Sequence, residues 1–473
     1  MIHIPILRRG QPYESVETVE LVHHATGKPV ATVSQANSGM VVRDINRIDD
    51  TVLERFTIAE LIDICNRAAE RFVGATLPIG DQKQTYNDYI VQLSATTGMP
   101  HGYCHANAQK IKRVLGEMQT VLAGLTRGFD LCILDKGYGE QNGRMLSYYR
   151  AGRTFGAVLP SNSPGVHGLW IPAIALKAPI VLKPGREEPW TPYRIIEALA
   201  AEGIPREALG FYPTDHAGAG ELLRGVSRAM LFGDTTTTAP WRDDCRVEIH
   251  GPGFSKVILG DDTADDWEKY LDVIAGSIAA NGGRSCINAS AVWTPSNGKK
   301  IADALAERFA IVAALPADDP KASIAAFGNR AMAERLSEMV DFELKSPGAV
   351  DVTQEIRGSR RLVTKGRVSY LLPTVIWCED REHPLCNREF LFPFTSVVEC
   401  PTAEIPGAIG ASLVVSAITK DRKLIDALMS SSNVDRLNIG AIPTYQLSWD
   451  QPHEGNLFEH LYRQRAFQVE PTT

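Results

Sequence analysis

The chain has 473 residues, a formal net charge of −7 and 44% hydrophobic residues, a composition typical of a globular protein. Its length exceeds what one ordinary hydrophobic core supports, so two or three domains are expected. The acidic balance, with a pI near 5.9, argues against a general nucleic-acid binder and against a protein that binds anionic membrane surfaces.

The sequence contains no recognisable targeting or membrane-spanning segment. A short apolar run precedes the basic pair Arg8–Arg9, which is the wrong order for a secretory signal. No run approaches the roughly 18 to 20 apolar residues that a bilayer span needs. The eight cysteines are too sparse for a disulfide framework. We therefore expect a cytoplasmic protein with reduced thiols.

The predicted secondary structure changes near residue 154, from helices to alternating strands and helices. Amphipathic helices are predicted over residues 50–75 and 104–125, and a hairpin turn over residues 137–143. Beyond them, "FGAVLPS" and "PIVLKP" each read as a strand, and "GVHGLWIPAIALKA" between them reads as a helix. A further helix is expected from Thr191 as N-cap to Gly203 as terminator.

This alternation of strands and helices predicts an α/β fold with a parallel, doubly wound sheet, whose ligand lies beyond the carboxyl ends of the strands. The usual dinucleotide fingerprint is missing, because Leu223 occupies the place of the third glycine in "GAGELL". Further along the chain, a helix over 263–280 is predicted to begin with a Thr263–Asp266 capping box. This helix is predicted to end at "NGG", so that Cys286 lies in the loop that follows.

Four polar residues at predicted strand or helix ends have the chemistry of a catalytic site. Cys286 is a candidate nucleophile, because Arg284 and the small residues around it suit a thiolate of lowered pKa. Glu248 can serve as a general base for water. Asn162 offers an amide donor for an oxyanion, and Lys183 a cation for a ribose or phosphate.

The segments that carry those residues, in their order along the chain, resemble segments of the aldehyde dehydrogenase superfamily. "LPSNSP" is similar to its P-W-N-x-P segment, "IVLKPGREEP" to V-V-L-K-P-x-E-x-T-P, and "EIHG" to E-L-G-G. "NGGRSC" resembles its N-x-G-Q-x-C nucleophile loop, and "EFLFP" its E-x-F-G-P segment. The chain is identified as a divergent member, with the resemblance running from about residue 10 to residue 465.

The resemblance implies oxidation of an aldehyde to a carboxylic acid with NAD or NADP. Cys286 attacks the carbonyl, and Asn162 with the Cys286 N–H holds the oxyanion. Hydride loss from the thiohemiacetal leaves a thioester, and Glu248 activates the water that hydrolyses it. Lys183 and Glu389 bind the adenosine-side and nicotinamide-side riboses.

Departures from the family pattern affect mainly the cofactor segments. Arg186 stands where the family carries a glutamate for the adenosine 2′-hydroxyl, so NADP becomes at least as plausible as NAD. In "LFGDTTTTAP", Gly233 matches the family's glycine, but Asp234 replaces its phosphate-binding serine. A carboxylate beside a pyrophosphate is repulsive unless it is neutralised.

The sequence leaves functions other than hydrolytic aldehyde oxidation open. A CoA-acylating aldehyde dehydrogenase, or the reverse acyl-CoA reductase, is the main alternative, and Glu248 speaks against it. A cofactor-free cysteine hydrolase lacks an identifiable base, and loss of function is disfavoured by the intact Cys286, Asn162 and Glu248. No metal site is expected: "CEDREHPLC" and "HGYCH" lack paired metal-ligand spacing.

The resemblance also implies an aldehyde-dehydrogenase-like architecture. Residues 1–127 and 154–250 are expected to form a Rossmann-like NAD(P)-binding domain, residues 251–440 an α/β catalytic domain, and residues 128–153 with 441–473 a small oligomerisation element. The partners expected are a small-molecule aldehyde and further copies of the chain, as a homodimer or homotetramer, with neither nucleic acid nor membrane.

Overall fold

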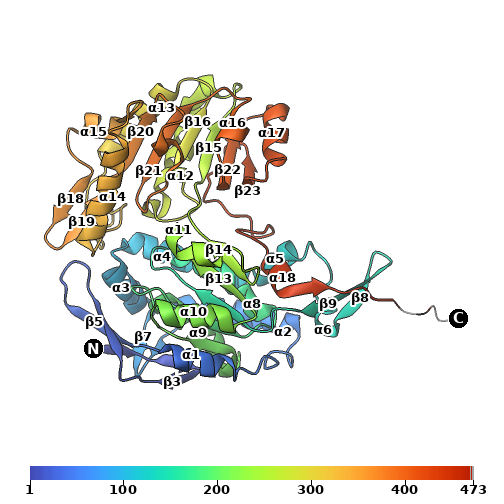
Figure 1. Ribbon diagram of the computed structural model, residues 1–473. Coiled ribbons are helices and arrows are strands. Elements are labelled where there is room, and N and C mark those ends of the chain that lie inside the picture. The colour runs from blue at the N-terminus through green and yellow to red at the C-terminus, as the bar shows by residue number, and fades with distance from the viewer. Residues whose placement is uncertain (469, 471–473) are drawn as a thin grey trace.

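The computed structural model describes residues 1–468 and 470, and two large sheets dominate it (Figure 1). The first sheet has five parallel strands, with two antiparallel strands at one edge. In spatial order these are β14 (Val247–His250), β13 (Arg228–Phe232), β10 (Phe155–Val158), β11 (Ile180–Lys183), β12 (Leu209–Phe211), β2 (Ile6–Arg8) and β3 (Gln11–Tyr13).

Helices cover both faces of this sheet, because its central strands are buried on both sides. In β11, Ile180 and Leu182 join the core on one face, whereas Val181 joins the core on the other. The first face carries α2 (Ile58–Gly74), α4 (His101–Gly116), α5 (Met118–Leu125) and α9 (Trp190–Ala201), and the second α1 (Ser38–Ile45) and α10 (His216–Gly225). The doubly wound parallel sheet expected from the sequence is therefore confirmed.

The second sheet lies in the other lobe of Figure 1 and is also mainly parallel. Its order is β17 (Ala349–Asp351), β20 (Thr374–Cys378), β21 (Phe394–Glu399), β16 (Ala291–Thr294), β15 (Lys256–Leu259), β22 (Ser412–Ile418) and β23 (Val434–Ile439). One face packs on α14 (Arg330–Glu343) and α17 (Arg422–Met429), and the other on α12 (Leu271–Ala279), α13 (Gly298–Ala310) and α15 (Val352–Arg357).

A three-stranded arm extends away from both lobes (Figure 1). It contains β8 (Tyr138–Gln141), β9 (Arg144–Arg150) and, from the far end of the chain, β24 (Tyr462–Gln464). The predicted hairpin turn is confirmed, since Asn142 and Gly143 take the left-handed φ values of 53° and 73° that such a turn requires.

Smaller elements complete the two lobes and their connections. They are β1 (Ile2–Ile4), β4 (Thr18–Val22), β5 (Pro29–Ser34), β6 (Leu77–Ile79), β7 (Gln82–Gln84), α3 (Tyr86–Thr97), α6 (Cys132–Lys136), α7 (His167–Trp170), α8 (Pro172–Ala175), α11 (Thr235–Thr238), β18 (Leu362–Lys365), β19 (Val368–Leu371), α16 (Ile405–Ala408) and α18 (Leu457–Leu461). Among the described residues, none of the helices has both the length and the apolar character of a membrane span.

Two predicted helix starts were wrong. The capping box at Thr263 does not form, because the Thr263 hydroxyl instead donates to the Ile418 carbonyl at 2.6 Å, and a 3-10 segment precedes α12. Helix α9 starts at Trp190 rather than after an N-cap Thr191. The carboxylate of buried Glu188 accepts the Thr191 N–H at 2.8 Å and so caps this helix from the preceding turn.

Candidate active site

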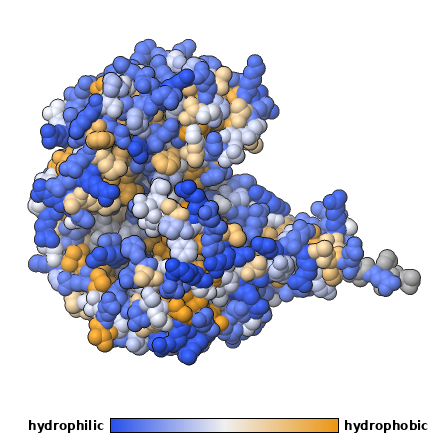
Figure 2. Space-filling model, viewed as in Figure 1, coloured by the Kyte–Doolittle hydropathy of each residue, from blue (hydrophilic) through white to orange (hydrophobic). Residues whose placement is uncertain are grey.

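A cavity of about 1220 Å³ lies between the two lobes, and a hollow is visible there in Figure 2. It runs along the carboxyl ends of the first sheet's parallel strands and reaches the loop that carries Cys286. The segments that build its floor and wall are 160–163, 186–187, 233–234, 250–252 and 284–287. The cavity thus lies where a doubly wound sheet places its ligand.

The loop of Cys286 depends on three consecutive left-handed residues. Asn281, Gly282 and Gly283 have φ values of 54°, 66° and 67°, so the chain turns sharply where α12 ends. A side chain at Gly283 would overlap the backbone of Phe392 and Pro393. This turn leaves Cys286, the candidate nucleophile, half-buried on the cavity wall.

Asn281 fixes this loop against both neighbouring elements. Its amide nitrogen donates to the hydroxyls of Ser163 and Ser285, each at 3.1 Å, and its oxygen accepts from Asn107 of α4 at 2.8 Å. The Cys286 carbonyl in turn accepts a hydrogen bond from Ser255 at 2.7 Å. The loop is therefore held by side-chain bonds from both lobes.

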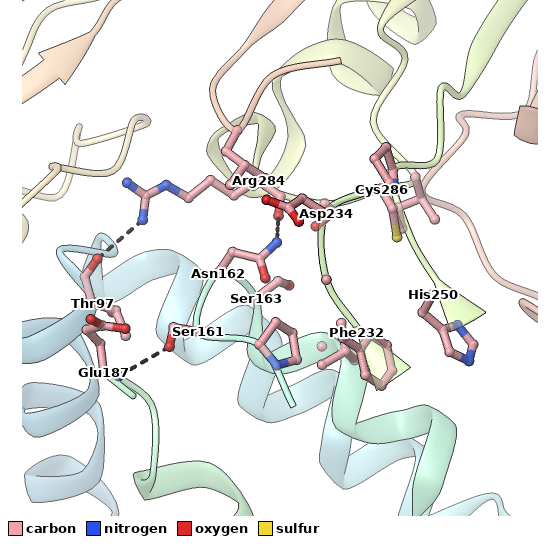
Figure 3. A pocket seen from close by; sticks show the side chains of 18 of the residues that line it. Thr97, Ser161, Asn162, Ser163, Glu187, Phe232, Asp234, His250, Arg284 and Cys286 are labelled. Carbon is pink, nitrogen blue, oxygen red and sulfur yellow. Dashed lines mark hydrogen bonds between the residues drawn. The ribbon is translucent and has the colours of Figure 1, made fainter. Parts of the chain in front are cut away.

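Asn162 lies beside the nucleophile loop, in the turn that follows β10 (Figure 3). Its amide nitrogen donates to the Arg284 carbonyl at 2.8 Å, two residues before Cys286. An amide carries two N–H hydrogens, so one of them remains for an oxyanion formed next to the sulfur. Both Asn162 and Cys286 line the cavity.

Arg284 does not lower the pKa of Cys286, and that expectation was wrong. Its guanidinium points away from the sulfur (Figure 3), donates to the carbonyls of Thr97 and Ala326 at 3.2 and 3.1 Å, and lies over the Phe327 ring. Burial, the negative charges of Glu454 and Glu389 and the hydrogen bond to Glu454 raise the pKa of Cys286 well above its ordinary value. Arg284 instead fastens the nucleophile loop to α3 and residue 326.

Glu454, which lies outside the sequence motifs, is the carboxylate in contact with the nucleophile. The Cys286 thiol donates to Glu454 Oε1 at 3.3 Å, and the Glu454 side chain is 6% exposed. Burial favours the protonated acid, but the hydrogen bond from His250 and nearby positive charge outweigh it and lower the pKa of Glu454 to about 2. Glu454 is therefore a carboxylate at neutral pH.

His250 connects this carboxylate to Glu248. Its Nδ1 is 3.0 Å from Glu454 Oε2, its Nε2 is 3.3 Å from Glu248 Oε1, and its ring stacks on Phe232 at 4.5 Å between centroids (Figure 3). Burial opposes charge on the imidazole, but the two carboxylates raise the pKa of His250 to about 9. At neutral pH His250 is thus an imidazolium between two carboxylates.

Glu248, the base expected from the sequence, lies on the far side of that imidazole. It is not among the residues that line the cavity, whereas His250, two residues later on β14, is. A side chain at Gly455 would overlap the Glu248 carboxylate, which shows how closely the C-terminal segment covers it. Glu248 Oε1 lies 3.3 Å from His250 Nε2, and neither atom has a hydrogen-bond partner among the described residues. The role of Glu248 as a base remains a prediction.

Four of the five residues expected to bind a dinucleotide line the cavity. Arg186, Gly233 and Asp234 line it, but Lys183 does not. Asp234 caps α11 by accepting the Thr237 N–H at 2.8 Å, and this bond contributes most to a lowered pKa of the carboxyl. The predicted carboxylate in the phosphate segment is therefore ionised and faces the cavity.

Glu389 lines the cavity, and the backbone that follows β14 holds its carboxylate. One oxygen accepts the N–H groups of Gly253 and Phe254 at 3.0 and 2.6 Å. Burial outweighs these bonds and raises the pKa of Glu389 to about 7. Its expected contact with the nicotinamide-side ribose remains a prediction.

Known proteins show the same architecture. The family model described as "Aldehyde dehydrogenase family" matches residues 12–405. The chain belongs to the aldehyde dehydrogenase family. The structure of an aldehyde dehydrogenase from Bacillus cereus in complex with NAD+ matches with a TM-score of 0.76 at 15% identity, covering 99% of this chain and 97% of that one.

Among curated aldehyde dehydrogenases, the mitochondrial enzyme of Leishmania tarentolae is 22% identical over 412 residues, which are 82% of this chain and 76% of that one. The geranial dehydrogenase of Castellaniella defragrans is 21% identical over 253 residues, 51% of each chain. The chain thus matches about half the length of this second relative. The family assignment supports an NAD(P)-dependent aldehyde dehydrogenase activity.

The cavity fits the anionic dinucleotide that this family uses. Its lining contains four arginines in addition to Arg284, which complement phosphate charge; they are Arg186, Arg330, Arg335 and Arg367. Asp234 departs from the family pattern at the phosphate segment. The positive charge of Arg335 helps to lower the pKa of the Asp234 carboxyl, so a cation lies near this carboxylate. Within the described residues, no group of three or more His, Cys, Asp or Glu side chains is arranged to hold a metal ion.

Two residues outside the quoted motifs have different roles: His167 belongs to the core, and Glu454 belongs to the site. His167 is a buried core histidine: its Nε2 lies 2.9 Å from Glu188, and its Nδ1 accepts from Trp170 at 2.9 Å. Glu454 gave no spacing signal, although the following glycine, with φ of 90°, marks the turn. His250 gave a signal that was missed, since it replaces the first glycine of the family's E-L-G-G segment.

Proposed function

We propose that the protein oxidises an aldehyde to a carboxylic acid with NAD or NADP, through a thioester on Cys286. The observation that carries this proposal is the placement of Cys286 and Asn162 on one cavity wall, with the Asn162 amide 2.8 Å from the carbonyl of Arg284. The bound cofactor supplies the hydride acceptor. The protein supplies the nucleophile, the oxyanion donors and the proton acceptor.

Each protein group has a defined task in this proposal. The Cys286 sulfur forms a bond to the aldehyde carbon, while the Asn162 amide and the Cys286 N–H stabilise the oxyanion. Arg186 and Gly233 lie where they can contact the adenosine and phosphate parts of the cofactor, and Glu389 lies near the reacting sulfur. Lys183 is half-buried at the end of β11, so its ribose contact requires reorientation toward the cavity.

The experiment that tests the function measures NAD(P)H formation by the purified protein with short, long, aromatic and semialdehyde substrates. Each reaction is run with and without CoA. We expect CoA-independent reduction of NAD or NADP, with the acid as product. Strict dependence on CoA would instead establish the CoA-acylating alternative. Glu248 no longer argues against that alternative, because it is not among the residues that line the cavity.

Arg186 provides a separate prediction on cofactor choice. We expect NADP to bind at least as tightly as NAD, because a cation at this position of the cavity wall favours a 2′-phosphate. Replacing Arg186 with alanine should weaken NADP binding by roughly 10- to 100-fold, the value of one charge-assisted hydrogen bond, and leave NAD binding nearly unchanged. Fluorescence titration with both reduced cofactors measures this, and a wild-type preference for NAD would contradict it.

The arm supports self-association of the chain as a homodimer or homotetramer. Three large side chains on β8 and β9, Tyr138, Met145 and Tyr149, are 40 to 49% exposed. Oligomers commonly cover such apolar surface and exposed strand edges. A cytoplasmic location is supported by the eight free cysteines, of which Cys132 and Cys245 are exposed. Sedimentation analysis of the purified protein tests the oligomeric state.

A further inference from the structure

We propose that Lys110 selects an aldehyde that carries a carboxylate, an ω-oxo acid, as the substrate of this enzyme. Lys110 lines the same cavity as Cys286. Its ammonium has no hydrogen-bonded partner in the part of the chain that the structure describes. The inference rests on the proposed function, because it names the substrate class of that same reaction.

One part of the cavity is lined by helices α4, α5, α7 and α8 and by the segment 447–457. It contains none of the five residues expected to bind the cofactor, so it is the part available to the aldehyde. Large apolar side chains line it, which suits a substrate with a hydrocarbon body. They include Val114, Val121, Leu125, Leu169, Leu447 and Trp449.

Lys110 brings a positive charge into this part of the cavity. It lies on α4 one turn before Val114, so the two side chains share one face of the helix. Its Nζ lies beside Gly165, where an added Cβ would be 3.3 Å from the nitrogen. Gly165 also lines the cavity and follows Asn162 by three residues. The ammonium is therefore next to the turn that carries the proposed oxyanion donor.

The charged groups that act on Lys110 do so without a direct bond. They are Glu454, Cys286 and Arg436. Burial lowers the pKa of Lys110, because an ammonium is less stable away from water. A carboxylate placed beside the ammonium favours its charged form. Binding of an anionic substrate and the charge on Lys110 therefore stabilise each other.

The carboxylates near Cys286 already have positive partners. His250 lies between Glu454 and Glu248, at 3.0 and 3.3 Å, and Arg436 adds a positive charge near Glu454. Two carboxylates thus face two cations, and Lys110 is an additional positive charge. A substrate carboxylate would compensate this charge, whereas an uncharged aldehyde would bury the ammonium further without a partner.

Glu389, another carboxylate on the cavity wall, does not supply the missing partner. It accepts the N–H groups of Gly253 and Phe254, and its charge acts on the buried Lys256 ammonium. It is not among the charges that act on Lys110. The anion that complements Lys110 is therefore one that the ligand brings.

A carboxylate suits this position better than a phosphate. Lys110 supplies one positive charge, so a phosphate dianion would leave a negative charge uncompensated close to Glu454. Arginines, which bind phosphate through paired N–H groups, lie on other segments of the cavity lining. They are Arg186, Arg330, Arg335 and Arg367.

The first test measures kcat/KM of the full-length protein with NAD(P)+ and matched aldehydes. These are ω-oxo carboxylic acids of three to six carbons, the methyl esters of the same acids, and 3-oxopropyl phosphate. We expect the best ω-oxo acid to exceed its methyl ester at least about 10-fold, the value of one charge-assisted hydrogen bond. The phosphate-bearing aldehyde should react less efficiently than the best acid.

The second test compares Lys110→Met with the control Lys112→Met. Lys112 is on the same helix but pairs with Glu70 at 3.0 Å and is not among the cavity-lining residues. Lys110→Met should lower kcat/KM for the best ω-oxo acid by about 10- to 100-fold, mainly through KM, and change that for the ester by less than about threefold. Lys110→Arg keeps the charge and should keep the preference for the acid.

The third test needs no turnover. Alkylation of Cys286 by iodoacetamide is followed by peptide mass spectrometry without cofactor, at rising concentrations of 4-hydroxybutanoate or of its uncharged counterpart butane-1,4-diol. The half-protecting concentration of 4-hydroxybutanoate should be at least about 10-fold below that of the diol in wild type and in Lys112→Met. It should rise about 10-fold or more in Lys110→Met, whatever the alkylation rate of the free variant.

Four results would overturn the proposal. Two concern wild type, so misfolding of a variant does not protect it: a kcat/KM for the acids no higher than for their esters, or a higher value for the phosphate-bearing aldehyde. The others are an equal loss on acid and ester in Lys110→Met, which indicates a structural role, and unchanged protection in that variant. If wild type oxidises no aldehyde, the proposed function fails, while protection by 4-hydroxybutanoate still tests the carboxylate site.

Discussion

Replacing Cys286 with alanine is expected to reduce aldehyde-dependent NAD(P)H formation by at least about 10⁴-fold. Removal of a nucleophile that forms the covalent intermediate leaves only binding and oxyanion stabilisation, and comparable losses in other nucleophilic enzymes exceed this value. The side chain lies half-buried on the cavity wall. Its removal should therefore leave the fold and NAD(P)H binding intact, as measured by circular dichroism and fluorescence titration.

Cys132→Ala is the matched control for this experiment. Cys132 is also a free cysteine, but it is exposed at the start of α6, outside the residues that line the cavity. We expect this variant to turn over at the wild-type rate. Residual activity of Cys286→Ala above about 1% of wild type would show that another group is the nucleophile.

Replacing Asn162 with alanine should lower kcat by about 10²- to 10³-fold, the usual loss when one oxyanion donor is removed. The effect should fall on kcat more than on KM, because the oxyanion exists only after Cys286 has attacked. Steady-state kinetics with the best substrate of the aldehyde screen measure both constants.

A structural effect of the Asn162 substitution can be separated from a catalytic one. Asn162 also holds the Arg284 carbonyl at 2.8 Å, so the variant loses one bond to the nucleophile loop. Asn281 holds the same loop through Ser163 and Ser285, and it should keep Cys286 in place. We therefore expect an unchanged alkylation profile of Cys286. A tenfold or smaller loss in kcat would contradict the oxyanion role.

Much of the fold was predictable because local patterns decide it. The strand that ends at Lys183 is buried on both faces, and the "NGG" turn after α12 needs the left-handed φ values of 54° to 67° that Asn and Gly tolerate. Both features follow from neighbouring residues. The turn that places Cys286 in a loop after α12 can therefore be predicted from the residues next to it.

The site was predicted less completely because the carboxylate that contacts Cys286 comes from far away in the sequence. No local pattern shows that the segment after β23 returns to the nucleophile and places Glu454 at 3.3 Å from the sulfur. The role of Arg284 could not be read either, since its partners are carbonyls of Thr97 and Ala326 from two other segments. Long-range backbone acceptors leave no trace in residue spacing.

The covalent intermediate on Cys286 is the central claim, and mass spectrometry of the wild-type protein tests it most directly. The protein is mixed with an aldehyde and NAD(P)+, quenched with acid within one turnover, and digested for peptide mapping. We predict an adduct on Cys286 equal to the mass of the aldehyde less two hydrogens, formed only when the oxidised cofactor is present. An adduct on a different residue, or turnover with no adduct on Cys286 at any quench time, would contradict this mechanism.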